Sequence, residues 1–192
     1  GIVMKYLQKV LPSDVIITNG AGNFAVWPNK FFQFGAGSRL LAPQSGAMGY
    51  GVPAAIAAKA TFPDRTVVCF AGDGDFQMTC QELATAAQAQ IFPIILIVNN
   101  ATYGTIRVHQ EKNYPGRVSC TDIVNPDFIG LAQSFGFLGI SVKTTDGFFA
   151  AFSQALNSKN GAVLDLNVSS ESLVPSQSLS EIRQKALNNQ KD

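Results

Sequence analysis

Two short polar stretches follow the two most hydrophobic segments of the chain and carry the residues best suited to chemistry. In the first, GDG, Asp73 lies between two glycines directly after the apolar run VVCFA. In the second, Asn99 and Asn100 follow the apolar run IILIV. A carboxylate oxygen, an amide oxygen and a nearby backbone carbonyl are hard ligands of the kind that Mg²⁺ takes, together with phosphate oxygens and water. Either stretch alone is compatible with an ordinary turn, whereas the pair predicts two halves of one magnesium site.

The glycines beside Asp73 suggest an anion as the partner of that metal. Gly72 and Gly74 allow a tight turn and a close approach of the backbone to a ligand. A helix expected to begin at Phe76 would present free N–H groups and the positive end of its dipole to an anion. We therefore expect a diphosphate, held by N–H groups and bridged by the metal.

Alternating strands and helices must bring both stretches to one edge of a sheet. The patterns predict strands at 14–18, 66–71, 92–99, 137–142 and 161–168, helices at 2–11, 50–63, 76–90, 126–136, 146–157 and 176–192, and a polar loop at 111–122. Strands separated by helices imply right-handed βαβ units. We expect an α/β fold: a doubly wound, mainly parallel sheet of about six strands with helices on both faces.

The spacing of the two stretches agrees with neighbouring strands. Gly74 and Asn99 are separated by 24 residues, which is room for one crossover helix and the next strand. The ends of neighbouring strands lie about 5 Å apart, and ligands bind beyond the carboxyl ends of parallel strands. Asp73 and Asn100 would then be able to share one cation.

Composition limits the classes of protein to consider. The 192 residues fit one domain, and only 14% of them are charged against about 25% in typical globular proteins. This low charge predicts surface that is covered by another domain or subunit. A net charge of +1 gives no reason to expect nucleic acid, and no apolar run approaches the roughly 20 residues of a membrane helix. We expect a single domain over 1–192 that binds neither nucleic acid nor a membrane.

The cysteines and the one histidine show no metal-binding spacing. Cys69, Cys80 and Cys120 form no CxxC pair, and His109 does not complete a zinc motif with them. Reduced thiols and the lack of a signal peptide predict a cytoplasmic protein.

The roles of several other residues stay open. His109 is either polar surface or part of a substrate face, and Arg107 and Arg117 either meet a substrate carboxylate or are solvated. Trp27 and the aromatic run at 31–34 are expected to pack in the core or at a subunit interface.

The complete pattern resembles a known enzyme family. GDG, 24 residues and NN match the signature of thiamine diphosphate enzymes. The surrounding stretches APQSGAMGYGVPAAIAAK and NNATYGTIR resemble the C-terminal cofactor-binding domain of the acetolactate synthase and pyruvate oxidase group, from about Leu7 to Val168. The resemblance implies that domain's fold, thiamine diphosphate and Mg²⁺ as cofactors, and a 2-oxo acid as substrate. FAD would belong to another domain of the full-length enzyme.

The resemblance also implies roles for individual positions. Asp73 and Asn100 correspond to side-chain ligands of Mg²⁺, and Thr102 to the residue whose carbonyl is the third protein ligand. The carbonyl of Gly46 would accept a hydrogen bond from the aminopyrimidine of the cofactor. Met48 would lie beneath the cofactor and hold it in a bent conformation, in which the cofactor can remove the proton from its own thiazolium C2. The positions implied to hold the diphosphate are Gly22, Asn23, Phe24, Gly72, Gly74, Asp75, Tyr103 and Gly104. Relatives often carry Gln-His at Asn23-Phe24, so Asn23 is the better candidate for a side-chain contact.

One part of the family's machinery has no counterpart in the sequence. In the family, a glutamate on the pyrimidine-binding domain of a neighbouring subunit activates the cofactor, and none of Glu82, Glu111, Glu171 and Glu181 matches its motif. We therefore expect no catalytic residue in this chain and no pyrimidine-binding or central domain. The start at Gly1 favours a fragment of a larger homodimeric or homotetrameric enzyme over a split small subunit. The isolated chain is expected to bind cofactor weakly without turnover.

Three alternatives remain at this level. The same domain could serve a benzoylformate- or oxalyl-CoA-type decarboxylase or an oxidase. It could be a non-catalytic module, although intact Asp73, Asn100 and Met48 argue against that. It could also be an unrelated Mg²⁺-nucleotide binder on a doubly wound sheet.

Overall fold

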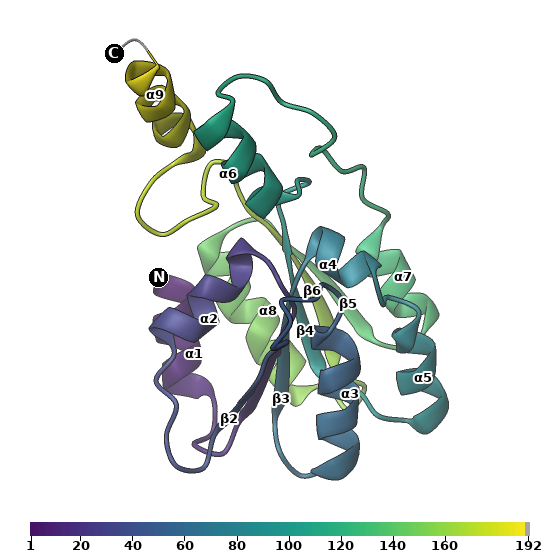
Figure 1. Cartoon of the computed structure of the whole chain (residues 1–192). Coiled ribbons are helices and arrows are strands. Elements are labelled where there is room, and N and C mark those ends of the chain that lie inside the picture. Colours follow the sequence, from purple (N-terminus) through teal and green to yellow (C-terminus); the bar gives the residue numbers. More distant parts are fainter. Residues whose placement is uncertain (191–192) are drawn as a thin grey trace.

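A single parallel sheet forms the centre of the molecule. The computed structural model describes residues 1–190, with helices on both sides of six strands (Figure 1). The strands are β1 (Ile16–Asn19), β2 (Arg39–Leu41), β3 (Val67–Gly72), β4 (Ile94–Asn99), β5 (Leu138–Val142) and β6 (Ala162–Asn167). Their order is β2-β1-β3-β4-β6-β5, and every neighbouring pair is parallel. The predicted doubly wound α/β fold is confirmed.

Two helical layers cover the two faces of the sheet. On one side lie α1 (Ile2–Val10), α2 (Val26–Phe31) and α8 (Thr145–Asn157), and on the other α3 (Gly51–Thr61), α5 (Glu82–Ala89) and α7 (Phe128–Ser134) (Figure 1). Each side has its own hydrophobic cluster, the first around Leu7 and Phe152 and the second around Leu83 and Phe128. Strand side chains alternate between the two clusters, which explains why the central strands read as continuous apolar runs.

The central strands β3 and β4 position the two polar stretches. β3 is buried along its whole length, and β4 over its first four residues. The two strands are direct neighbours, with Gly72 opposite Val98 in the register. Asp73 and the Asn99-Asn100 pair therefore leave the sheet at the same edge, as their spacing predicted.

The single helix predicted at 76–90 is wrong. The chain forms α4 (Asp73–Gln77), turns, and starts again at α5 (Glu82–Ala89). At the turn, the Thr79 hydroxyl donates to the Gly49 carbonyl at 2.8 Å, which joins this turn to the loop before α3. Met78, in this turn, is 49% exposed. The helix near the glycines thus begins at Asp73 rather than at Phe76.

The sequence patterns predicted neither β2 nor α2. The edge strand β2 has only three residues, and α2 contains Pro28 in its first turn, where a proline needs no hydrogen-bond donor. The loop predicted at 111–122 begins later than expected, because α6 (Gly104–Asn113) includes its first three residues.

The C-terminal helix α9 (Leu179–Asn189) packs against α6 above the carboxyl edge of the sheet (Figure 1). Its first turn has a capping box between Ser178 and Glu181. The buried Glu111 of α6 accepts from Arg183 Nε at 2.8 Å and from the Gly116 N–H at 2.9 Å. This charge-assisted bond from Arg183 holds the pKa of Glu111 below its usual value. The helix predicted at 176–192 is thereby tied to α6, while residues 191–192 lie outside the described part.

None of the helices within residues 1–190 combines the length and the apolar character that crossing a membrane requires.

Candidate functional site

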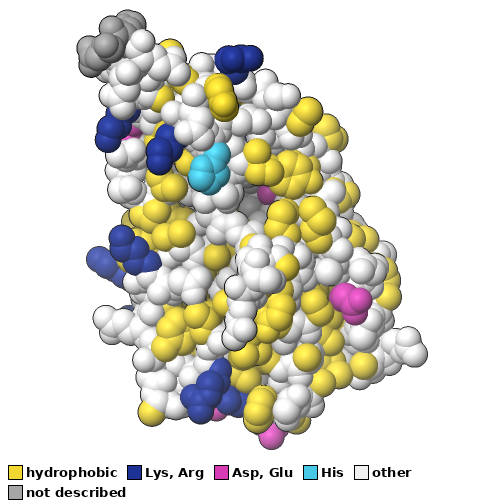
Figure 2. All heavy atoms as spheres, in the orientation of Figure 1, with side chains coloured by type: hydrophobic (Ala, Val, Ile, Leu, Met, Phe, Trp, Pro, Cys, Tyr) yellow, Lys and Arg dark blue, Asp and Glu magenta, His cyan; other side chains and the backbone are white. Residues whose placement is uncertain are grey.

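A pocket opens at the carboxyl edge of the sheet. It is lined by residues that follow β1, β3, β4 and β6, and Figure 2 shows a hollow there, on a face with few charged side chains. Of the predicted site residues, only Gly46 does not line it. Those that do are Gly22, Asn23, Phe24, Met48, Gly72, Asp73, Gly74, Asp75, Asn100, Thr102, Tyr103 and Gly104.

Asp73 sits at the start of α4, with its carboxylate held in a defined orientation. The residue is 3% exposed. Its Oδ1 accepts from the Gly74 N–H at 2.9 Å, and its Oδ2 accepts from Asn125 Nδ2 at 2.9 Å. An ionised carboxylate has about four lone-pair positions, so these two bonds leave room for a cation.

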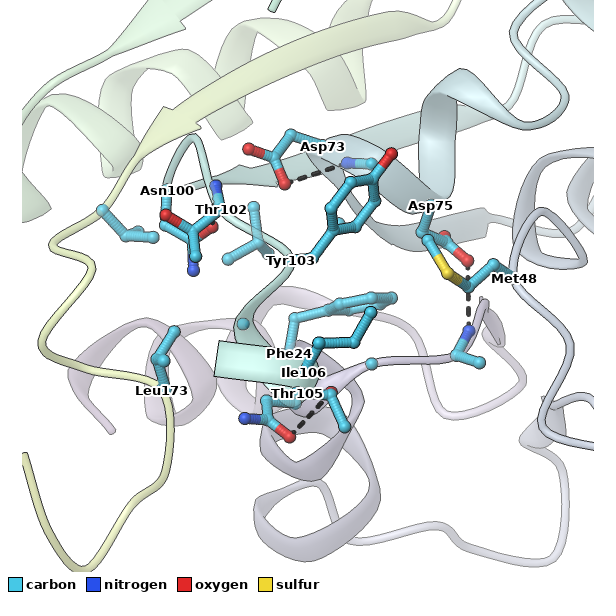
Figure 3. A pocket seen from close by; sticks show the side chains of 18 of the residues that line it. Phe24, Met48, Asp73, Asp75, Asn100, Thr102, Tyr103, Thr105, Ile106 and Leu173 are labelled. Carbon is cyan, nitrogen blue, oxygen red and sulfur yellow. Dashed lines mark hydrogen bonds between the residues drawn. The ribbon is translucent and has the colours of Figure 1, made fainter. Parts of the chain in front are cut away.

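The Asn100 stretch forms a tight turn after β4. Ala101 has a φ of +53°, a left-handed conformation that few non-glycine residues adopt, and its N–H donates to Asn99 Oδ1 at 3.2 Å. The turn directs the Thr102 N–H at Asn100 Oδ1, 3.0 Å away. Figure 3 shows Asn100, Thr102 and Asp73 around one side of the pocket. The structure thus brings together the three residues predicted to bind metal.

Two glycines allow aromatic rings to lie directly against the backbone of this site. A Cβ atom at Gly74 would lie 2.5 Å from Cε1 of Tyr103, and one at Gly72 would lie 2.9 Å from the ring of Phe24. Real Cβ atoms are essentially never found at such distances, so a side chain at either position would have to displace the neighbouring ring. Phe24 contributes an apolar ring to the pocket, and Asn23 as the better polar contact stays a prediction.

Asn23 supplies an unpaired donor. Its Oδ1 accepts from the Thr105 hydroxyl at 3.0 Å, while its Nδ2 is buried without a hydrogen-bond partner within the described residues. A buried donor without a partner costs about 1–3 kcal/mol, so such groups are normally satisfied by a ligand or water. An anionic ligand in the pocket is one group that can satisfy it.

Asp75 has a structural role that its sequence position did not reveal. Its Oδ1 accepts from the N–H groups of Ala21 at 3.1 Å and Gly49 at 2.8 Å, which joins the loops after β1 and before α3. Burial raises the pKa of Asp75 to about 6. Met48, in the second of these loops, is 37% exposed and reaches the pocket near Asp75 (Figure 3). Gly46 is exposed, with a φ of +68°, and its carbonyl role stays a prediction.

Several lining residues were missed by the sequence reasoning. They are Ala21, Trp27, Val98, Thr105, Ile106, Val168, Ser172 and Leu173. Three of them follow β6, and the only available signal was that this strand would end at the same edge of the sheet. Trp27 packs on the hydrophobic core, as expected, but also lines the pocket.

The pocket lining does not include His109, Arg107 or Arg117, whose roles were left open. His109 and Arg117 are exposed, and the Arg117 guanidinium lies over the ring of Tyr114. Arg107 donates to Thr121 Oγ1 at 2.6 Å and to Asp122 at 3.2 Å. Among the described residues, no glutamate lines the pocket.

The donor set fits a hard cation that also binds an anionic ligand. Within residues 1–190, no group of three His, Cys, Asp or Glu side chains could hold a metal alone. The available ligands are one carboxylate, one amide oxygen and one backbone carbonyl, from Asp73, Asn100 and Thr102. Mg²⁺ is commonly held by one or two carboxylates plus substrate phosphates. The unpaired Asn23 donor is consistent with such an anion.

Comparisons with known proteins agree with this geometry. Residues 20–166 match the family described as "Thiamine pyrophosphate enzyme, C-terminal TPP binding domain". Similar proteins include the acetolactate synthase large subunit of Parasynechococcus marenigrum, which is 36% identical over 82% of this chain and 26% of that protein. The large subunit of Buchnera aphidicola subsp. Schlechtendalia chinensis is 34% identical over 97% of this chain and 33% of that protein. The large subunit of Haemophilus influenzae is 42% identical over 69% of this chain and 24% of that protein.

The chain thus spans about a quarter to a third of the length of these relatives. The family match covers most of the chain, including both polar stretches of the pocket. The chain belongs to the family of thiamine pyrophosphate enzyme C-terminal TPP binding domains.

Proposed function

We propose that the pocket binds the Mg²⁺-diphosphate end of thiamine diphosphate, and that residues 1–192 form one cofactor domain of an acetolactate synthase-like enzyme. The observation that carries the proposal is the convergence of Asp73, Asn100 and Thr102 beside the unpaired amide of Asn23. A cation and an anion bound together would use both features.

Each part of the pocket has a task in this proposal. Asp73, Asn100 and the Thr102 carbonyl would hold Mg²⁺, and Asn23 would donate to the diphosphate. The diphosphate would lie against the backbones of Gly22, Phe24, Gly72, Gly74, Asp75, Tyr103 and Gly104. The Gly46 carbonyl would accept a hydrogen bond from the aminopyrimidine, and Met48 would support the bent cofactor. When bound, thiamine diphosphate supplies a carbon nucleophile that adds to the carbonyl of a 2-oxo acid and takes up the electron pair released with CO₂.

The complete enzyme would need more than this chain. We propose a cytoplasmic homodimer or homotetramer in which a pyrimidine-binding domain of a neighbouring subunit supplies the activating glutamate. FAD, if present, would bind elsewhere. Two apolar side chains that line the pocket, Met48 and Ile106, are 37% and 51% exposed, which supports a covering partner. The reaction would be decarboxylation of a 2-oxo acid followed by transfer to a carbonyl, a lyase and transferase chemistry.

Calorimetric titration of the chain tests the cofactor assignment. Thiamine diphosphate with Mg²⁺ should bind, whereas ATP with Mg²⁺ should not, and EDTA should remove the binding. Asp73→Ala should abolish the Mg²⁺-dependent part, while Asp64→Ala removes an exposed carboxylate before β3 and should leave binding unchanged. Equal binding of ATP, or unchanged affinity in Asp73→Ala, would contradict the proposal.

A further inference from the structure

Asn125 lies between the two polar stretches that form the metal site. Its Nδ2 donates to Asp73 Oδ2 and to Asn99 Oδ1, both at 2.9 Å, and its Oδ1 accepts from Gln77 Nε2 at 2.9 Å. Both N–H donors of this amide and its carbonyl oxygen are therefore in use. These three bonds hold the side chain in the orientation that faces Asp73.

The direction of each bond in this network is fixed by carboxylates at both ends. Asn99 donates through Nδ2 to Asp165 Oδ1 at 2.9 Å, so its own oxygen faces Asn125. Asn125 must then turn its NH₂ group toward Asn99 and Asp73, because an ionised carboxylate only accepts. The chain from Asp165 through Asn99 and Asn125 to Asp73 connects β6, β4 and β3 at the carboxyl edge of the sheet.

The backbone before Asn125 is hydrogen-bonded to the loop that carries Thr102. The Tyr103 N–H donates to the Thr121 carbonyl at 2.8 Å, and the Ile123 N–H donates to the Ala101 carbonyl at 2.9 Å. Thr102 lies inside this short antiparallel pairing. One segment, 121–125, thus contacts both the loop that carries Thr102 and the carboxylate of Asp73.

We propose that Asn125 is a positioning residue that fixes the orientation of the Asp73 carboxylate for a divalent cation. The inference rests on the proposed function. Asn125 occupies one lone pair of Oδ2, and the Gly74 N–H occupies one of Oδ1, which prevents rotation of the carboxylate and leaves the remaining lone pairs for the metal. Partners that orient a metal ligand typically contribute about 10–100-fold to metal affinity.

Mn²⁺ binding to the chain, followed by electron paramagnetic resonance with and without thiamine diphosphate, tests this role. With the cofactor present, Asn125→Ala should weaken Mn²⁺ binding roughly tenfold. Asn125→Asp has nearly the same shape but puts a second carboxylate beside Asp73. It should strengthen the binding of Mn²⁺ alone and weaken the binding of thiamine diphosphate. Gln77→Ala removes a partner of Asn125 without touching Asp73, and should change Mn²⁺ affinity less than Asn125→Ala does.

The Mn²⁺ affinity of the folded Asn125→Ala chain separates positioning from simple packing. A packing role would lower the unfolding temperature of this variant and leave the Mn²⁺ affinity of the folded chain unchanged. Mn²⁺ affinities of both variants within twofold of the original chain would overturn the inference and leave the proposed function standing. If Asn125→Ala does not fold, Asn125→Asp alone decides. Failure of the original chain to bind Mn²⁺ with thiamine diphosphate would contradict the proposed function and the inference together.

Discussion

The side chain of Asp75 accepts a hydrogen bond from the main-chain N–H of Gly49, with 2.8 Å between Oδ1 and N, and so joins α4 to the loop before α3. The same oxygen accepts from the Ala21 N–H in the loop after β1. Three segments that are distant in the sequence are thus joined by one buried carboxylate, and residues of each segment line the pocket.

The buried carboxylate should make stability depend on pH. Burial raises the pKa of Asp75 from 3.8 to about 6, so the folded state holds the proton more tightly than the unfolded state. Its contribution to stability should be fully present below pH 3.8 and should fall as the pH rises through 6, by about 2–3 kcal/mol. Asp75→Asn keeps an oxygen acceptor for both N–H groups and should flatten this part of the profile. Urea unfolding between pH 4 and 7 in EDTA measures it. An unchanged slope in the variant would refute the assignment.

The contact between Glu111 and Arg183 should stabilise the C-terminal helix. Arg183→Ala leaves the buried Glu111 without its main partner, which should lower the free energy of unfolding by roughly 3 kcal/mol. The contribution should be present above pH 4.5 and lost as the pH falls through the lowered pKa of Glu111. Lys185→Ala removes an exposed cation from the same helix and serves as the control for urea unfolding at pH 7. Equal destabilisation by the two variants would mean that the contact between Glu111 and Arg183 does not contribute to the free energy of unfolding.

Gly74 should not tolerate a side chain. The added Cβ in Gly74→Ala would lie 2.5 Å from the ring of Tyr103 and 3.1 Å from Cδ1 of Ile123. Overpacking of this kind typically costs about 1–3 kcal/mol, and the displaced Tyr103 ring should also weaken cofactor binding. Gly35→Ala is the matched control, because nothing lies within 4 Å of the new Cβ there. Thermal unfolding and calorimetry of both variants check this, and similar behaviour of the two would contradict it.

Asn23 should contribute to binding through Nδ2. Asn23→Asp keeps the oxygen that accepts from Thr105 but replaces the unpaired donor with a negatively charged oxygen. Since hydrogen bonds to charged groups contribute about 1.5–3 kcal/mol, the affinity for thiamine diphosphate with Mg²⁺ should fall at least tenfold. Asn160→Asp makes the same charge change at an exposed position before β6 and should bind as before. Indistinguishable calorimetric affinities of the two variants would exclude a direct contact from Asn23.

The sequence was most informative where physical patterns are local. The apolar runs before Asp73 and Asn99 predicted buried parallel strands, and the spacing between them predicted neighbours in the sheet. These two facts were enough to place Asp73 and Asn100 at one edge, whereas Thr102 was added by the family resemblance. The left-handed turn at Ala101 fell inside a stretch that was singled out, although its conformation had no signal of its own.

Features that depend on contacts between distant segments could not be predicted. The break between α4 and α5 brings Thr79 to Gly49, and the Asp73 carboxylate accepts from Asn125, which lies between the predicted loop and the next predicted helix in a segment that no pattern singled out. Leu173 reaches the pocket only because the chain after β6 returns over the carboxyl edge of the sheet. The strand β2 is too short to show an alternating pattern.

The central claim is that one cation is held by Asp73, Asn100 and Thr102 together with a diphosphate. The most direct measurement is a crystal structure of the chain with thiamine diphosphate and Mg²⁺, or with Mn²⁺ and its anomalous signal. The account predicts one metal ion about 2.0–2.2 Å from an Asp73 carboxylate oxygen, Asn100 Oδ1 and the Thr102 carbonyl oxygen, with diphosphate oxygens in the same coordination shell. A cofactor bound without these three ligands, or a metal ion elsewhere in the molecule, would contradict it.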